Sequence, residues 1–318
     1  MEKIIEQIQK SKRILITSHM NPDGDAIGSS LALLLALNNN NNENKVIRLV
    51  LQDEVPSFLK FLKHYFLIEK SNIIETKYKF DLVITLDSAD LQRIGNVSDF
   101  ISEKTKLINI DHHISNLEFG DLNYVDAKAS SASEIVYKLI KEMKIEISLD
   151  IAEALYTGIS ADTGNFAYSN TSSETLLIAS KLRGIGIDNE KISQYLYSNK
   201  SEKQLRILGL ALENMEFFEN VKLNLFYLTQ ADLKRFKAKK EDSEGIVEML
   251  RSYKECEVAL FLREEEDGTI KGSFRSKGRD VNKVAQLFDG GGHKKAAGFK
   301  SDKTKKEIVE MILKKLNI

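Results

Sequence analysis

Three short apolar runs, each followed by acidic or histidine residues, constrain the fold more than any other feature of this sequence. They are Arg13–Thr17, Phe80–Leu86 and Lys106–Ile110. Unbroken runs of this kind are typical of parallel strands that are covered on both faces. Helical patterns lie near 29–37, 57–66, 132–143, 150–158 and 173–183. Strands that alternate with helices predict a doubly wound, mostly parallel α/β sheet.

A second part of the chain has a different pattern. The 318 residues are too many for one ordinary domain and fit two. Residues 190–218 are expected to form one or two helices. After them we expect strands at 221–229, 256–263 and 269–275, helices at 244–253, 280–288 and 303–316, and a glycine turn before the last helix. We therefore predict an α/β domain over 1–188, a helical connector over 189–219 and a smaller α+β domain over 220–318.

Composition excludes several classes of protein. Hydrophobic residues make up 42% and charged residues 29%, which excludes disorder as the main state. The single cysteine, Cys256, excludes a disulfide framework and a cysteine-based zinc ribbon. The apolar stretch Ala26–Leu37 is too short to span a bilayer, and the first ten residues do not resemble a signal peptide. We expect a cytoplasmic protein that does not insert into a membrane.

Two further sequence features bear on charge and on turns. Residues 270–318 contain 13 Lys and Arg against 5 Asp and Glu, so this segment carries +8 and the rest of the chain −9. Either a solvated lysine-rich face or a basic wall facing an anionic ligand would explain this asymmetry. The Asn-rich tract 38–44 is interpreted as a surface turn before a strand at 45–51.

Polar clusters follow the three apolar runs and predict a metal centre. Because the carboxyl ends of parallel strands meet at one edge of a sheet, these residues should gather there. Packed carboxylates repel one another unless cations neutralise them. Imidazole and carboxylate ligands together favour Mn, Fe, Co or Zn, and the number of ligands is enough for two ions that share one carboxylate. The residues are His19, Asp23, Asp25, Asp87, Asp111, His112 and His113.

Two other acidic or histidine positions are weaker candidates. Asp162 lies between Gly158 and Gly164 and is either a further ligand or a turn residue. His64 lies at helical spacing with aromatic residues and is interpreted as structural.

The C-terminal part offers a candidate anion site. Arg275 and Ser276 end an expected strand, and Gly290, Gly291 and Gly292 precede His293 and two lysines. Consecutive glycines allow backbone N–H groups to turn toward an anion, although a glycine run is often only a loop.

Taken together, the motifs resemble the DHH phosphoesterase family. Four of them match in order: His19-Met-Asn-Pro-Asp23-Gly-Asp25-Ala-Ile-Gly28-Ser29, Asp87-Ser-Ala-Asp90, Asp111-His112-His113 and Asp162. Phe274-Arg275-Ser276 and Gly290-Gly-Gly-His293-Lys-Lys-Ala-Ala-Gly298 resemble the C-terminal domain associated with that family. The two-domain length is similar to that of its small oligoribonuclease and pAp phosphatase branch, the nanoRNases.

The resemblance implies a role for each residue and an active site in the cleft between the two domains. One metal ion, usually Mn²⁺, would be bound by His19, Asp23 and Asp87. The second would be bound by Asp25, Asp87, His112 and Asp162, with Asp87 bridging. His113 would contact the scissile phosphate, and Asp111 would orient His112 or its strand. Arg275, Ser276, His293 and the Gly290–Gly292 backbone would bind the substrate's phosphate or terminal nucleotide. Arg93 would reach the substrate, unless it is only a surface arginine.

The implied activity is metal-assisted hydrolysis of short RNA oligonucleotides to 5′-mononucleotides and of 3′-phosphoadenosine 5′-phosphate (pAp) to AMP. The catalytic residues would be Asp87, His113 and Arg275. One alternative is a signalling-dinucleotide phosphodiesterase that acts on linear or cyclic di-AMP, and a pyrophosphatase or polyphosphatase is a further one. A metal-dependent nucleic-acid binder without turnover is the distant option. The oligomeric state is left open, with a homodimer among the alternatives.

Overall fold

The computed structural model describes residues 1–40, 45–74 and 79–317. The chain divides into two compact units, Met1–Asn199 (unit 1) and Lys200–Ile318 (unit 2). This division falls inside the segment 189–219 that we predicted to be a connector, so one helix of that segment belongs to each unit. The predicted domain boundaries themselves stay a prediction. No helix among the described residues has the length and apolar character of a membrane span.

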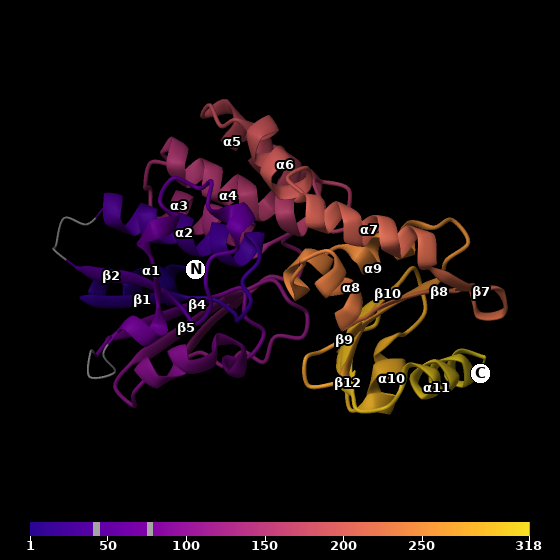
Figure 1. Ribbon diagram of the computed structural model, residues 1–318. Helices are drawn as coiled ribbons and strands as arrows, with labels where there is room; N and C mark the ends of the chain where they lie inside the picture. Colours follow the sequence, from indigo (N-terminus) through magenta and orange to yellow (C-terminus); the bar gives the residue numbers. More distant parts are fainter. Residues whose placement is uncertain (41–44, 75–78, 318) are drawn as a thin grey trace. The chain divides into compact units, whose positions relative to one another are not determined.

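Unit 1 contains the parallel sheet expected from the sequence (Figure 1). Every strand pair in it is parallel, and the order is β3-β2-β1-β4-β5-β6. In chain order the strands are β1 Arg13–Thr17, β2 Val46–Leu51, β3 Ile68–Lys70, β4 Leu82–Leu86, β5 Lys106–Asp111 and β6 Leu122–Val125. The short edge strands β3 and β6 were not expected.

Both faces of this sheet are buried, which explains the unbroken apolar runs. Ile14 and Ile16 of β1 pack into a large core with the helices of unit 1, whereas Leu15 between them packs into a smaller cluster on the other face. That second face is covered in part by the 3₁₀ segment Leu91–Phe100. The helices of unit 1 are α1 Glu2–Lys10, α2 Gly24–Asn39, α3 Ala132–Glu142, α4 Leu149–Asp162, α5 Ser173–Gly184 and α6 Asn189–Tyr197.

Helices α2 and α4 approach unusually closely because glycines face each other. A Cβ atom on Gly28 would lie 2.5 Å from the carbonyl oxygen of Ala154 and 2.8 Å from the backbone nitrogen of Gly158. This contact brings the start of α2 and the end of α4 to the same edge of the sheet. The glycine in the first motif therefore has a packing role.

In unit 1, one predicted helix does not form, and the predicted Asn-rich turn begins as the end of a helix. The prediction of a helix at 57–66 is wrong, because the segment has only two short 3₁₀ turns, Ser57–Leu59 and Tyr65–Leu67. Its His64 bonds with Asp150 at the start of α4, at 2.8 Å. Of the Asn tract, residues 38 and 39 end α2 and Asn40 caps it, while 41–44 lie outside the described residues.

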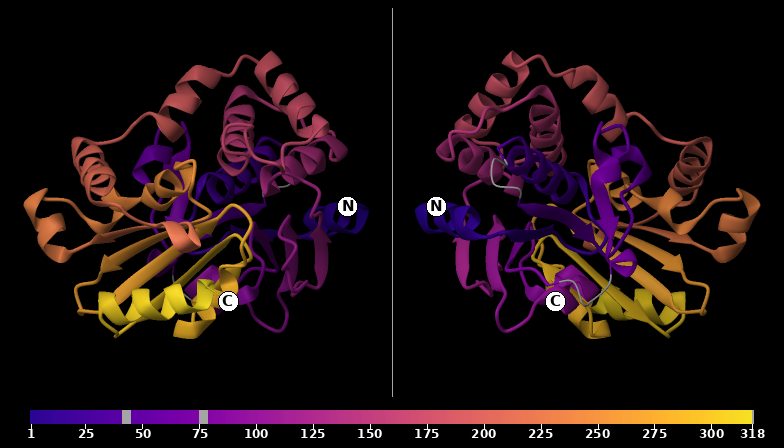
Figure 2. Two further views of the ribbon diagram at one scale, coloured as in Figure 1. Left: turned by 90° about the vertical axis from the view of Figure 1, so that its right-hand side faces the viewer. Right: turned by 90° about the vertical axis from the view of Figure 1, so that its left-hand side faces the viewer.

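Unit 2 is an α+β domain built on a mixed sheet in the order β11-β12-β10-β9-β8-β7. Its strands are β7 Glu216–Phe218, β8 Leu223–Leu228, β9 Val258–Glu264, β10 Ile270–Ser276, β11 Gly291–His293 and β12 Ala296–Ser301. Its helices are α7 Glu202–Asn214, α8 Gln230–Arg235, α9 Ile246–Ser252, α10 Asn282–Ala285 and α11 Lys305–Leu316. Helices α10 and α11 cover one face, as Figure 2 shows for α11, and α7, α8 and α9 cover part of the other.

The C-terminal glycine segment differs from its prediction. Instead of a glycine turn, Gly291–His293 is a strand that pairs with β12, a strand the sequence did not indicate. The helix expected at 280–288 is the short α10 followed by a 3₁₀ turn, Gln286–Phe288. Gly292, at φ 149°, accounts for this arrangement, because a Cβ there would lie 2.5 Å from the carbonyl oxygen of Ala296.

Candidate metal centre

The structure brings all six predicted metal ligands to one edge of the unit 1 sheet. His19 follows β1, Asp87 follows β4 and His112 follows β5, and these three strands are neighbours. Asp23 and Asp25 lie at the start of α2, and Asp162 is the last residue of α4. Their ligand atoms form two groups, His19–Asp23–Asp87 and Asp25–His112–Asp162, each with its atoms within 4.8 Å of one another.

Asp87 lies between the two groups. Its Oδ2 is 3.4 Å from His19 Nε2, and its Oδ1 is 3.4 Å from His112 Nε2. The side chain is buried, and the residue has a left-handed backbone with φ 54°. Such a conformation costs free energy in a residue other than glycine and is often found at functional sites. One carboxylate thus faces a histidine of each flanking strand.

The first group is oriented by its own loop and by α2. His19 Nδ1 bonds with the carbonyl oxygen of Met20 at 2.9 Å, which places the proton on Nδ1 and leaves Nε2 as the ligand atom. Asp23 Oδ1 caps α2 by accepting the backbone N–H groups of Asp25 and Ala26 at 3.0 and 3.1 Å. Asp23 Oδ2 lies 3.9 Å from His19 Nε2.

The second group is held by the start of α3. Asp25 is buried and accepts the backbone N–H groups of Ala132 and Ser133 at 2.6 and 2.9 Å. His112 Nε2 is 4.0 Å from Asp25 Oδ2 and 3.5 Å from Asp162 Oδ2. The amides that hold Asp25 were missed by sequence reasoning, because backbone groups leave no residue-specific signal.

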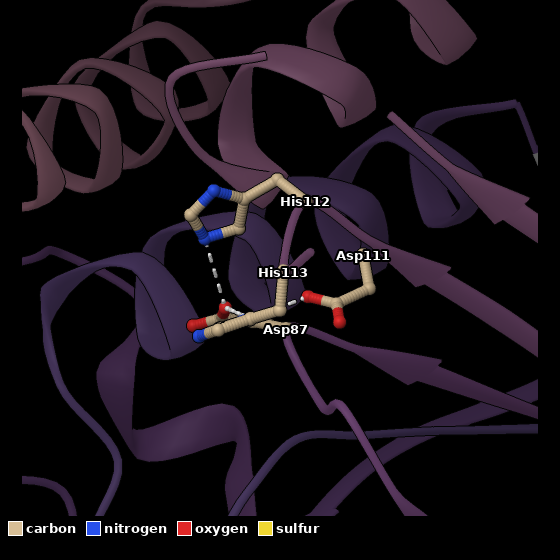
Figure 3. A group of neighbouring side chains, drawn as sticks. All are labelled: Asp87, Asp111, His112 and His113. Atoms are coloured by element: carbon tan, nitrogen blue, oxygen red, sulfur yellow. Dashed lines mark hydrogen bonds and ion pairs between the residues drawn. The ribbon is translucent and has the colours of Figure 1, made fainter. Parts of the chain in front are cut away.

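Asp111 contacts a different histidine from the one that the sequence suggested. We expected Asp111 to orient His112 or its strand; its carboxylate instead bonds with His113 Nδ1 at 2.8 Å (Figure 3). Asn116 Nδ2 donates to the other oxygen of Asp111 at 2.6 Å. Asp111 therefore fixes the ring of His113. Asn116 was not anticipated from the sequence.

The electrostatics of the site are those of crowded acids without enough positive charge. Burial and the charges of Asp87 and Asp162 raise the pKa of Asp25 well above its ordinary value. Burial would lower the pKa of His112, but the Asp87 carboxylate and its acidic neighbours outweigh it and raise the pKa to about 10. The same competition raises the pKa of His19 to about 9. Both shifts show that the surrounding carboxylates favour positive charge in this site.

The residues fit divalent metal ions. Among the described residues, Asp87 Oδ1 and His112 Nε2 are buried atoms that lack a hydrogen-bond partner of good geometry, although they face each other. Ligand atoms that share an ion at about 2.0–2.2 Å lie about 3 to 3.5 Å from one another. The 3.4 and 3.5 Å separations around Asp87 and His112 match that spacing.

Most of the predicted substrate residues lie on strands of unit 2; Gly290 directly precedes β11, and Arg93 belongs to unit 1. Arg275 of β10 and His293 of β11 both pair with Ala296 of β12, so their side chains share one face of the sheet. Arg275 Nε bonds with Glu248 of α9 at 3.0 Å, a partner that the sequence did not indicate. Ser276 is buried, and its hydroxyl accepts the N–H of Gly278 at 3.1 Å.

Gly290 and Gly292 have a structural explanation beside the functional one, whereas a Cβ on Gly291 would meet nothing closer than 3.8 Å. A Cβ on Gly290 would lie 2.3 Å from the carbonyl oxygen of Gly298 in β12, so the close approach of β12 requires glycine at position 290. Gly291 and His293 are exposed. In unit 1, Arg93 is half-buried, and its carbonyl oxygen accepts the N–H of Met20 at 2.7 Å, next to His19.

Comparisons with known proteins agree with this geometry. Residues 13–159 match the model of the DHH family, N-terminal domain, and residues 222–317 match that of the DHHA1 domain. The chain is 34% identical over 287 residues to the bifunctional oligoribonuclease and PAP phosphatase NrnA of Thermus thermophilus. This alignment covers 90% of this chain and 83% of the relative. The chain is 32% identical over 299 residues to the protein of that name from Bacillus subtilis, with 93% and 91% covered. An exopolyphosphatase-related protein from Bacteroides fragilis superposes with a TM-score of 0.92 at 33% identity, covering 99% of this chain and 94% of that one.

Proposed function

Because the chain belongs to the DHH phosphoesterase family, we propose that it hydrolyses short RNA oligonucleotides to 5′-mononucleotides and pAp to AMP. The relatives from Thermus thermophilus and Bacillus subtilis are named for both activities. The single observation that carries the proposal is the position of Asp87, whose two oxygens face His19 and His112 from between two ligand groups. A carboxylate in that position could be shared by two metal ions close enough to act together in phosphoester hydrolysis.

The two ligand groups would each hold one divalent ion. His19, Asp23 and Asp87 would bind the first, and Asp25, His112 and Asp162, together with Asp87, the second. Imidazole beside carboxylate disfavours Mg²⁺ and suits Mn, Fe, Co or Zn. Among these we propose Mn²⁺ for both, because it is the ion that the family resemblance implies. When bound, the ions lower the pKa of a water molecule and offset the negative charge of the phosphate.

His113 would contact the scissile phosphate. Its hydrogen bond with Asp111 at 2.8 Å fixes the ring and raises the pKa of His113, which favours the positively charged form. In that form the opposite ring nitrogen, Nε2, would donate a hydrogen bond to a phosphate oxygen. A donor that is already oriented stabilises charge as it develops on that oxygen, with little reorganisation.

Unit 2 would bind the terminal nucleotide. Arg275 and His293 would supply positive charge on one face of its sheet, with Ser276 and the Gly290–Gly292 backbone beside them. An arginine fork can bind two phosphate oxygens at once. The contact of Arg275 with Glu248 supports this role, because it holds the guanidinium through Nε in a fixed position. Arg93 would add a further cation from unit 1.

A substrate panel with purified protein in Mn²⁺ tests the proposal. It compares RNA dimers to pentamers, a 24-mer, pAp, a cyclic dinucleotide, its linear form and pyrophosphate. We expect fast turnover of the short RNAs and pAp and slow turnover of the others. A preference for the cyclic or linear dinucleotide, or for pyrophosphate, would contradict the substrate assignment and leave the metal centre in place. No turnover of any substrate by protein that contains metal would contradict the enzymatic proposal.

A further inference from the structure

Glu134 of α3 is a buried acid that the proposed hydrolysis does not use. Its carboxylate accepts four hydrogen bonds: from the N–H and hydroxyl of Ser130 at 3.2 and 2.8 Å, from Thr175 at 2.8 Å and from Lys138 at 3.0 Å. Burial would raise the pKa of Glu134, but these donors outweigh it and lower the pKa. The side chain is therefore a charged anchor inside unit 1.

This anchor fixes the segment at the start of α3. Ser131 caps the helix by accepting the N–H of Glu134 at 3.1 Å. The next two backbone N–H groups, of Ala132 and Ser133, donate to the two oxygens of Asp25. The orientation of Asp25 thus depends on where the start of α3 lies.

The same segment is tied to the end of α4. Asn170 Nδ2 donates to the carbonyl oxygen of Ser130 at 2.9 Å and to that of Asp162 at 3.1 Å. The contacts of Glu134 and Asn170 therefore lead to two members of the group Asp25–His112–Asp162. The first group is oriented differently, by the carbonyl oxygen of Met20 and the cap of α2.

We propose that Glu134 is a positioning residue for the metal site formed by Asp25, His112 and Asp162. It acts by holding the segment Ser130–Ser133, whose backbone orients Asp25 and, through Asn170, supports the backbone at Asp162. The inference rests on the proposed two-metal function. Groups that orient a metal ligand from behind typically change metal affinity or activity about 10- to 100-fold when they are altered. A residue with only a structural role would not distinguish one ion from the other.

A Mn²⁺ titration of the full chain without substrate, followed by the electron paramagnetic resonance signal of free Mn²⁺, tests this role. Wild type should bind two ions. Glu134→Gln keeps the size of the side chain and removes its charge. It should bind one ion with unchanged affinity and the other about 10- to 100-fold more weakly. At limiting Mn²⁺ its turnover of pAp should fall, and excess Mn²⁺ should restore it.

Two variants accompany the test. Glu174→Gln removes the other carboxylate that Lys138 contacts, at 3.0 Å, and should bind Mn²⁺ like wild type. Thr175→Val removes one of the four hydrogen bonds to Glu134 and should lower the affinity for one Mn²⁺ ion about two- to tenfold. This variant keeps the inference testable if Glu134→Gln does not fold. Equal binding of both ions by Glu134→Gln and wild type, or equal weakening of both, would overturn the inference. A wild type that binds no pair of ions would contradict the proposed function instead.

Discussion

The two units hold their functional side chains in different ways. In unit 1 the ligands are backed by further contacts from within the unit: backbone amides of α3 hold Asp25, and the carbonyl oxygen of Met20 orients His19. In unit 2 the strand that carries His293 is exposed along its length, and the guanidinium of Arg275 contacts Glu248 of α9.

The difference follows from what each region has to bind. Metal ions require ligand atoms within a few tenths of an ångström of their positions, which needs a rigid, packed surround. A phosphate or nucleotide can be bound by cations on strands whose register alone sets their spacing. We therefore expect changes in unit 1 to affect metal binding and catalysis, and changes in unit 2 to affect substrate affinity.

The largest effect should come from Asp87→Ala. It removes the one carboxylate that both ligand groups face, at 3.4 Å on either side. Loss of several kcal/mol of metal-derived transition-state stabilisation corresponds to a fall in kcat/KM on the order of 10³-fold. Steady-state turnover of pAp measures it. Near-normal turnover would contradict the role of Asp87.

Gly28→Ala tests how far the unit 1 site depends on close packing. Its Cβ would lie 2.5 Å from a backbone oxygen of α4, so α2 and α4 would have to separate. We expect a loss of about 2–3 kcal/mol in the free energy of unfolding, together with weaker Mn²⁺ binding. Gly209→Ala in α7 is the matched control: it meets nothing within 4 Å and should stabilise its helix by about 0.5–1 kcal/mol. If urea unfolding showed the two variants to be equally stable, the claim that the unit 1 site depends on close packing of α2 against α4 would be contradicted.

His293→Ala should separate binding from catalysis. Loss of a charge-assisted hydrogen bond to the substrate should raise KM for pAp about tenfold or more. Elemental analysis should find the metal content unchanged, because all six proposed metal ligands lie in unit 1. Loss of the metals from this variant would show that the division of roles between the units is wrong.

The smallest expected effect is a pH dependence of stability. The pKa of Glu134 is lowered in the fold, so its contribution is fully present above the unfolded pKa of about 4.5 and is lost as pH falls through the folded value. At pH 7, Glu134→Gln should cost about 1–3 kcal/mol of unfolding free energy. Urea unfolding at pH 7 and at pH 4 should show this difference shrinking at the lower pH. A difference that stayed constant would mean that the charge of Glu134 contributes nothing.

Much of unit 1 could be predicted because its sheet is buried on both faces and its ligands follow the strands directly. The runs ending before His19, Asp87 and Asp111 indicated both the strands and the shared edge. The contacts that orient the ligands could not be predicted, because the amides that hold Asp25 come from a helix more than a hundred residues away. The contact of Asp111 with His113 could not be predicted either, because only the fold shows which of the two adjacent histidines turns toward that carboxylate.

Unit 2 was harder to predict near its glycines. A Gly-Gly-Gly run indicates a turn in sequence, yet here its last two glycines begin a strand that pairs with β12. The prediction for residues 57–66 was wrong for a related reason. Their apolar spacing resembles a helix, but the segment forms two short turns whose His64 is fixed by a distant partner, Asp150. Local pattern could not reveal either contact.

The measurement that tests the central claim most directly is a Mn²⁺ titration of three carboxylate variants beside wild type. The account predicts that Asp23→Asn weakens the binding of one ion, that Asp162→Asn weakens the binding of the other, and that Asp87→Asn weakens the binding of both. Electron paramagnetic resonance of free Mn²⁺ reads out all four proteins in the same way. If Asp87→Asn weakened only one ion, or left both bound as in wild type, Asp87 would not be shared between two metal sites, and the account would be contradicted.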